Sequence, residues 1–186
     1  MTDTLTSRLG LIKPTPGTSD QVDIAELNSN ADFIDKNFIP SAKIINTVAA
    51  PQTIPNNAAT QVLYNATAFD SYAARPEGAM ADTTNDQIVI RKDGIYIVIC
   101  GGNFAANAVG VRRLDLLKNG VTQGGDTALG FTGAANGLSY STPMDCVNGD
   151  LITVKVFQNS GAGLVWDLNT FVEGNFLGVV WHGSRT

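Results

Sequence analysis

From Ser41 onward, short strand-like runs follow one another, and turns rich in Gly, Asn and Asp separate them. Three of these turns carry sequences typical of tight strand connections: Asp93-Gly94, Asn119-Gly120 and Asn148-Gly149-Asp150. Helical periodicity is lost throughout this part of the chain. Many short strands without intervening helices predict an all-β, antiparallel sandwich, and their number favours a jelly roll over residues 41–186.

One stretch, "DQIVIRKDGIYIVICGGNFAA", joins two unlike strands through Asp93-Gly94. The first strand alternates as a surface strand does, whereas the second is almost wholly apolar and small. We predict a hairpin whose second strand is buried on both faces. Alternation gives that strand two apolar rows: Tyr96, Val98 and Cys100 on one face, and Ile95, Ile97 and Ile99 on the other. A soluble monomer rarely exposes such a row, so either a neighbouring chain covers it or a second sheet and loops do.

The N-terminal residues 1–19 combine three apolar side chains, Leu9, Leu11 and Ile12, with two prolines, Pro14 and Pro16. The prolines oppose a helix and favour an extended path. Such an arm has no core of its own, so we predict that it anchors to another protein.

Residues 20–40 are expected to form one short amphipathic helix that ends at Pro40. Its apolar side chains follow spacings of three and four, the pattern of a helical seam: Ile24, Leu27, Ala31, Ile34 and Phe38. Two heptads are too few for a free coiled coil. The helix either lies on its own domain or forms a trimer stalk held together by a larger body; the arm offers no core to lie on, which favours the stalk.

Charge and composition argue against several classes of protein. The formal net charge is −5, which opposes nucleic-acid binding. No stretch approaches the length of a membrane span, and the N-terminus has no apolar signal core. Cys100 and Cys146 lie in apolar segments, so we expect reduced core cysteines in a protein made in a cytoplasm, although spacing leaves their pairing open.

The sequence predicts no catalytic, metal or cofactor site, and hence no enzyme. The single histidine, His182, has no Cys or carboxylate beside it, and no nucleophile elbow or phosphate loop is present. Four aromatic residues could stack against a glycan, although core packing is the more frequent role for such residues: Trp166, Trp181, Tyr72 and Tyr140.

Residues 86–182 resemble the globular heads of the tumour-necrosis-factor and complement-subcomponent superfamily. The resemblance lies in four motifs that occur in order: "IRKDGIYIVICGGNF", "RRLDLLKNG", "VNGDLITVKVFQNSG" and "NFLGVVWHG". It implies a ten-strand jelly roll that forms a tight homotrimer. The residues expected to supply the head core and the trimer interface are Tyr96, Val98, Phe104, Leu114, Leu116, Phe157, Phe176 and Val179.

The segment "LGLIKPTPGTSDQVDIAELNSNADFIDKNF" resembles the N-terminal attachment segment of bacteriophage minor tail and fibre proteins. The motif is Asn28, Asn30, Asp32, Ile34 and Asp35, after a Leu-Gly-Leu-x-Lys-Pro stretch. It implies a virion structural protein, a short trimeric spike attached through its arm to other virion proteins, on the tail more readily than on the capsid. The head could also bind the host surface. The alternatives are a capsid decoration or head-fibre protein, a carbohydrate-binding module, and, least favoured, a depolymerase enzyme.

Overall fold

The computed structural model describes residues 4–5, 12–13, 30, 38–47, 51–132, 135–166 and 174–184. The chain divides into two compact units, Met1–Phe38 and Ile39–Thr186. In the first unit, strand β1 (Thr4–Leu5) pairs antiparallel with β2 (Ile12–Lys13), and Asn30 is helical. Most residues of the predicted arm and stalk lie outside the described part of the chain: Leu9, Leu11, Pro14, Pro16, Ile24, Leu27, Ala31 and Ile34.

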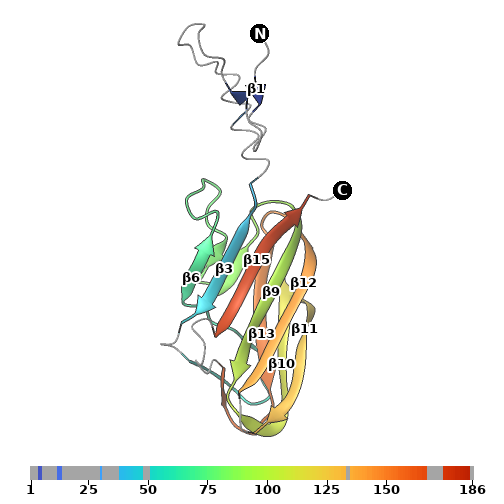
Figure 1. Ribbon diagram of the computed structural model, residues 1–186. Coiled ribbons are helices and arrows are strands. Elements are labelled where there is room, and N and C mark those ends of the chain that lie inside the picture. The colour runs from blue at the N-terminus through green and yellow to red at the C-terminus, as the bar shows by residue number, and fades with distance from the viewer. Residues whose placement is uncertain are drawn as a thin grey trace. The chain divides into compact units, whose positions relative to one another are not determined.

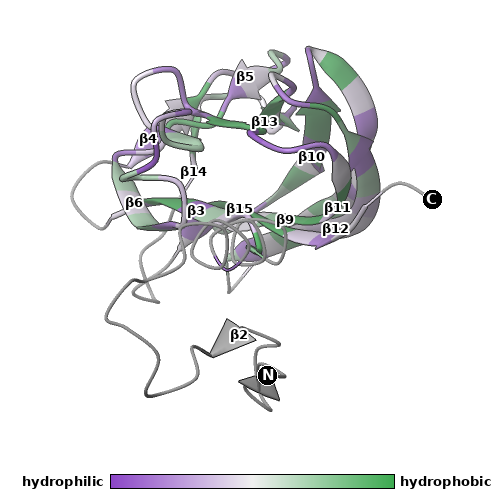
Figure 2. Cartoon of the chain, turned by 90° about the horizontal axis from the view of Figure 1, so that it is seen from above, coloured by the Kyte–Doolittle hydropathy of each residue, from purple (hydrophilic) through white to green (hydrophobic). Residues whose placement is uncertain are grey.

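The second unit is built from two antiparallel sheets that face each other, as the view in Figure 2 shows. The seven-stranded sheet has the order β4 (Gln52–Ile54), β14 (Leu164–Trp166), β9 (Gly94–Phe104), β15 (Asn175–Gly183), β3 (Ser41–Asn46) and β6 (Ala66–Asp70), and β12 (Asn136–Cys146) pairs with the other edge of β9. Strands β3, β15, β9 and β12 lie side by side in Figure 1.

The six-stranded sheet lies behind that layer in Figure 1 and centres on the long strands β10 and β13. Its order is β11 (Val121–Phe131), β10 (Asn107–Lys118), β13 (Leu151–Gln158), β8 (Gln87–Val89) and β7 (Ala81–Asp82), and β5 (Thr60–Gln61) also pairs with β13. The two layers confirm the predicted antiparallel jelly-roll sandwich. Among the described residues, no helix is long and apolar enough to cross a membrane.

The core lies between the sheets and is filled by alternate residues of the long strands. Tyr96, Val98 and Phe104 of β9 are fully buried, and they face residues of the other layer such as Leu116 of β10. Each large apolar side chain buried in this way contributes about 1.5–3 kcal/mol. The predicted core residues Tyr96, Val98, Phe104, Leu114, Leu116 and Val179 are all buried.

Phe157 and Phe176, which were predicted jointly for the core and the trimer interface, both point out of the sandwich. Phe157 alternates with the buried Val156 and Gln158, so it lies on the outer face of the six-stranded sheet, with the Arg113 guanidinium 5.2 Å from its ring centroid. Phe176 lies on the outer face of the other sheet, between buried neighbours along β15. Both positions follow from the two-residue period of a strand, which fixes the side once the register is known.

The turn at Asp93-Gly94 does not close a hairpin. Strand β8 pairs with β7 and β13, whereas β9 pairs with β12, β14 and β15, so the turn carries the chain from one sheet to the other. A side chain on Gly94 would overlap Trp181 Nε1 and the carbonyl oxygen of Gly183. Glycine is therefore required at this corner by the close approach of β15.

The turn at Asn119-Gly120 does close a hairpin, between β10 and β11. Asn119 and Gly120 both have positive φ, 50° and 79°, as a two-residue turn of this kind demands. Strand β11 itself was not among the predicted strands.

The two cysteines are buried, as expected of core residues. Burial raises the pKa of the Cys100 thiol to about 12. The thiol donates to the carbonyl oxygen of Tyr140, with Sγ 3.7 Å from that oxygen. Cys146, on β12, lies opposite Gly94 at the start of β9. Cys100 lies much further along β9, opposite Tyr140. The two side chains are thus placed too far apart along the ladder for a disulfide within the chain.

Candidate functional site

The outer face of the seven-stranded sheet carries the second apolar row of β9. Ile95 and Ile97 are half-buried and Ile99 is 40% exposed, whereas Tyr96, Val98 and Cys100 between them are completely buried. The predicted division into two rows is therefore confirmed. Within one chain the second sheet covers only the Tyr96 row, and the isoleucine row faces outward.

Neighbouring strands place further apolar side chains on the same outer face, with Lys43 among them. Ile97 lies opposite Val180 of β15, and Ile99 lies opposite Gly178. On the next strand Lys43 lies opposite Gly178 and Phe69. Directly opposite residues in a ladder share a face, so these side chains all point outward. We call the set Ile97, Ile99, Phe176, Val180 and Phe69 the apolar face.

The apolar face includes strongly exposed residues, and Lys43 lies among them. Val180 is 43% exposed and Phe69 is 47% exposed. The ammonium of Lys43 lies 5.1 Å from the centroid of the Phe176 ring, a cation–π contact within the same surface. A contiguous apolar surface on a sheet is typical of a protein–protein contact.

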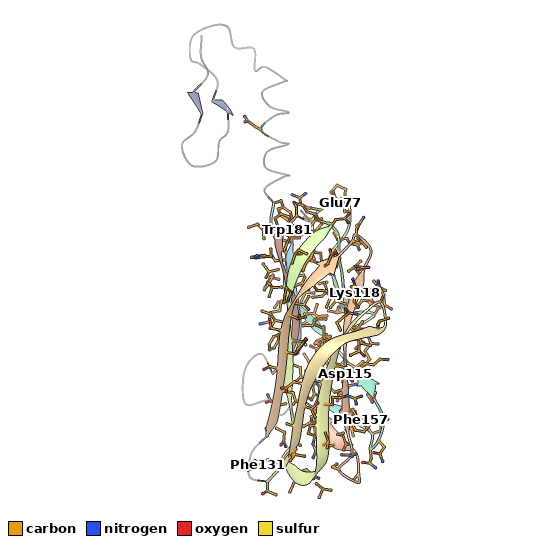
Figure 3. All side chains as sticks on the ribbon, turned by 90° about the vertical axis from the view of Figure 1, so that its right-hand side faces the viewer. Glu77, Asp115, Lys118, Phe131, Phe157 and Trp181 are labelled. Atoms are coloured by element: carbon orange, nitrogen blue, oxygen red, sulfur yellow. The ribbon has the colours of Figure 1, made fainter. Side chains whose placement is uncertain are left out.

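Strand β11, the edge of the six-stranded sheet, carries exposed apolar residues at both ends: Val121 at its start, and Leu129 and Phe131 near its end. Val121 is 64% exposed, Leu129 is 77% exposed and Phe131 is 60% exposed. Figure 3 shows Phe131 at the end of the sandwich opposite Trp181. Exposed apolar residues on an edge strand favour contact with another chain.

The two sheets are joined along the side formed by β11 and β12. Asp126 of β11 accepts a hydrogen bond from the backbone N–H of Ser139 of β12, at 3.0 Å. A side chain on Gly124 would overlap the Tyr140 ring, so glycine lets that ring lie against the β11 backbone. These contacts hold the edge strand β11 against β12, the neighbour of β9.

The far end of the sandwich contains a completely buried arginine. The Arg112 guanidinium donates to the carbonyl oxygens of Asn107, Val109 and Val111 at 3.0–3.1 Å, and it lies 5.8 Å from the Phe104 ring centroid. Burial lowers the pKa of Arg112 from its ordinary value. All three acceptors belong to the irregular part of β10, so Arg112 holds that bulge in shape.

The four aromatic residues considered for glycan stacking do not form one site. Trp166 is fully buried and packs edge-on against Phe104, with ring centroids 4.7 Å apart, and Tyr72 is buried as well. Trp181 donates from Nε1 to the carbonyl of Asp93 and carries the Lys92 ammonium over its ring. Tyr140 is half-buried against β11. Trp166 and Tyr72 therefore offer no open face to a sugar.

The remaining residues that the sequence singled out are placed as follows. Ile12 lies in strand β2 and Phe38 is partly exposed at the end of the first unit. His182 is exposed near the end of β15. In the part of the chain that the structure describes, no three His, Cys, Asp or Glu side chains are grouped as metal ligands would be.

The sequence predicted the isoleucine row and named Phe176 jointly for the core and interface, but it did not indicate Val180 or Phe69 as members of the apolar face. Phe69 ends a strand-like run that the structure divides into β5 and β6, and Val180 follows the buried Val179, so only the register of β15 shows that it faces outward. The two-residue period of a strand was the sequence signal that could place Phe176 on the outer face. Which residues lie beside it on neighbouring strands depends on the order of strands in the sheet, and no local sequence pattern contains that order.

Comparisons with known proteins agree on the fold. No family model matches the chain, and no curated protein matches its sequence. The Eiger TNF of S. frugiperda superposes with a TM-score of 0.59 at 12% identity, over 80% of this chain and 95% of that one. Murine APRIL superposes with a TM-score of 0.56 at 16% identity, over 78% of this chain and all of that one. At these identities the likeness concerns architecture: the second unit has the tumour-necrosis-factor-like jelly-roll fold.

Proposed function

We propose that the protein is a structural component of a bacteriophage virion, a short homotrimeric spike attached to the particle by its N-terminal arm. The observation that carries the proposal is the apolar face, which one chain leaves exposed across β9, β15 and β6. Burial of this face in a trimer would remove Ile99, Val180 and Phe69 from water. The tumour-necrosis-factor-like fold is compatible with self-association of this kind.

Attachment to a virion is supported by the N-terminal sequence. Its Leu-Gly-Leu-x-Lys-Pro stretch and the Asn-x-Asn-x-Asp-x-Ile-Asp motif resemble the attachment segments of phage tail and fibre proteins. The chain combines this segment with a stalk-like helical pattern and a compact head. This division into attachment segment, stalk and head fits a non-catalytic, structural role in a virion. We prefer the tail to the capsid as its location.

The assembly state is tested with the intact chain. Sedimentation equilibrium should give three times the chain mass, and Ile99→Asp should produce monomers because it places a charge in an apolar contact. Leu63→Asp is the matched control: Leu63 is 50% exposed on the segment between β5 and β6, and its variant should remain trimeric. A monomeric wild-type protein would contradict the proposed assembly.

The attachment role needs a separate experiment. Particles assembled with a chain that lacks residues 2–17 should lose the protein, whereas particles with the intact chain should keep it. Electron microscopy of antibody-labelled particles then distinguishes tail from capsid. Retention of the truncated chain at full occupancy would argue against an anchoring arm.

A further inference from the structure

Arg112 is a charged side chain that the sandwich encloses completely. A guanidinium carries five N–H donors. Nη1 and Nη2 donate to the carbonyl oxygens of Asn107, Val109 and Val111 at 3.0–3.1 Å, as described above. Nε, by contrast, has no hydrogen-bond partner among the described residues. Buried side-chain donors are nearly always paired, so this one requires a physical explanation.

The positive charge of the Arg112 guanidinium is also uncompensated. The ion pairs found in the described ranges involve Arg113 and Lys118, and no acidic side chain in those ranges pairs with Arg112. The three acceptors of Arg112 are neutral carbonyl groups, and the Phe104 ring centroid, 5.8 Å from Cζ, offers only a cation–π contact. A buried charge is costly unless an opposite charge is paired with it. The guanidinium therefore lacks both an acceptor at Nε and a counter-charge.

The polar group beside Arg112 on the same sheet is fully matched. Gln158 lies opposite Arg112 on β13 and is completely buried too. Its amide nitrogen donates to the carbonyl oxygens of Ile54 and Ala162, and its Oε1 accepts from Ser160. Polar pairing at this end of the core is thus well developed, and Nε of Arg112 is an exception to it.

Two further unpartnered polar groups lie near the same phenyl ring. Nε1 of Trp166 and the side-chain amide of Asn175 are buried and have no hydrogen-bond partner in the described part of the chain. The Trp166 ring packs against Phe104, the ring that Arg112 also contacts. A Cβ on Gly102 would overlap both Trp166 and Asn175, so those two side chains are neighbours. Because Arg112 Nε and Trp166 Nε1 can only donate, this interior has more donors than acceptors.

We propose that Arg112 binds a small inorganic anion, of the size of chloride, inside this end of the sandwich, with Nε as a donor to it. An anion both accepts from an N–H group and neutralises the guanidinium, whereas a water molecule does only the first. Such a site does not depend on the assembly or the attachment proposed above. Because the other Arg112 hydrogen bonds go to the bulge of β10, the ion fixes the shape of a surface that includes Val109, which is 59% exposed.

Crystals of the full-length chain soaked in sodium bromide test the site directly, because bromide replaces chloride and has an anomalous X-ray signal. The expected result is a bromide peak in hydrogen-bond contact with Nε of Arg112. A water molecule at that position, or a carboxylate of the chain itself, would overturn the proposal.

Thermal unfolding measures whether the ion stabilises the fold. Chloride is exchanged for gluconate at constant ionic strength, and each Tm is compared with that of Arg112→Met, which removes the charge and the donors. At chloride about 100 times its Kd, wild type should gain about 5 °C or more relative to the variant. Arg113→Met is the matched control: the Arg113 side chain is 46% exposed, and its variant should keep the full chloride response.

The two measurements together decide the outcome. A bromide peak combined with an equal chloride response in wild type and Arg112→Met would mean an adventitious ion only, and the proposal would fail. A chloride response that is lost in Arg112→Met and kept in Arg113→Met supports it. Should Arg112→Met not fold, the bromide experiment on wild-type crystals decides.

Discussion

Asp126 of strand β11 accepts a hydrogen bond from the backbone N–H of Ser139 on strand β12, and this contact links the edges of the two sheets. Strand β12 pairs with β9 on one side, so its other edge has backbone groups without a ladder partner. A carboxylate that accepts from such a group satisfies it and makes the edge less available for strand addition.

Asp126→Ala should therefore lower the free energy of unfolding by about 1–2 kcal/mol, through loss of a charge-assisted hydrogen bond. Urea denaturation measures the change. Asp115→Ala is the control, because it removes only the partly exposed ion pair with Arg113 (2.9 Å) and should cost no more than about 1 kcal/mol. Equal losses of unfolding free energy in the two variants would show that the Asp126–Ser139 hydrogen bond stabilises the protein no more than the exposed ion pair does.

Gly102→Ala should be among the most damaging single-methyl changes in the sandwich. Its Cβ would overlap Oδ1 of Asn175 and the Trp166 ring, both fully buried. Overpacking of this kind costs typically about 1–3 kcal/mol. Thermal unfolding should show a clear drop in Tm, whereas Gly183→Ala, which has no atom within 4 Å of the added Cβ, should leave Tm nearly unchanged. A Gly102→Ala protein as stable as wild type would contradict the close packing of Asn175 and Trp166 against Gly102.

Asp150 should make the sandwich sensitive to acid. Burial alone would raise the pKa of Asp150, but hydrogen bonds from the Val147 N–H and from Asn119 Nδ2, together with the charge of Lys118, outweigh it and lower the pKa. The folded state then favours the ionised carboxylate. Its stabilising contribution is present above the unfolded pKa of about 3.9 and is lost as the pH falls through the lower, folded value.

The measurement compares wild type with Asp150→Asn between neutral pH and about pH 2. Asp150→Asn should unfold more readily near neutrality, and the stability difference from wild type should shrink as the pH falls below about 4. A difference that stays constant over that range would show that ionisation of Asp150 is not what stabilises the turn.

The fold class could be predicted from the sequence because several signals agreed. Alternation within the strands, Asn119-Gly120 at a true hairpin and the absence of helical periodicity after Ser41 all indicated an antiparallel sandwich. Local signals could not show that Asp93-Gly94 connects different sheets, because a tight turn has the same composition whether its strands pair or separate. Strand β11 was missed because its glycines and polar residues give little alternation in "VTQGGDTALGF".

The candidate site was predictable only in part, for a related reason. The two rows of β9 follow from its own sequence, whereas the outer surface also depends on which strands lie beside it. Lys43, Phe69 and Gly178 come together because β3, β6 and β15 are neighbours, although they are distant in sequence. Trp166 and Tyr72 were candidates for ligand contact because amphipathic aromatic residues occur both in cores and at binding surfaces, and only the packing distinguishes the two.

Most of the predicted stalk lies outside the described residues, and its role is tested by Ile34→Asp. Ile34 belongs to the three-four pattern that also includes Leu27 and Phe38. If the helix forms the seam of a trimer, an aspartate at this position places a charge in each of three apolar contacts. The concentration at which the trimer dissociates should rise on the order of a hundredfold. Lys36→Asp, which changes a position outside the seam pattern, should alter it much less. Sedimentation at several concentrations measures both variants; an Ile34→Asp trimer as resistant to dilution as wild type would mean that the head alone holds the chains together.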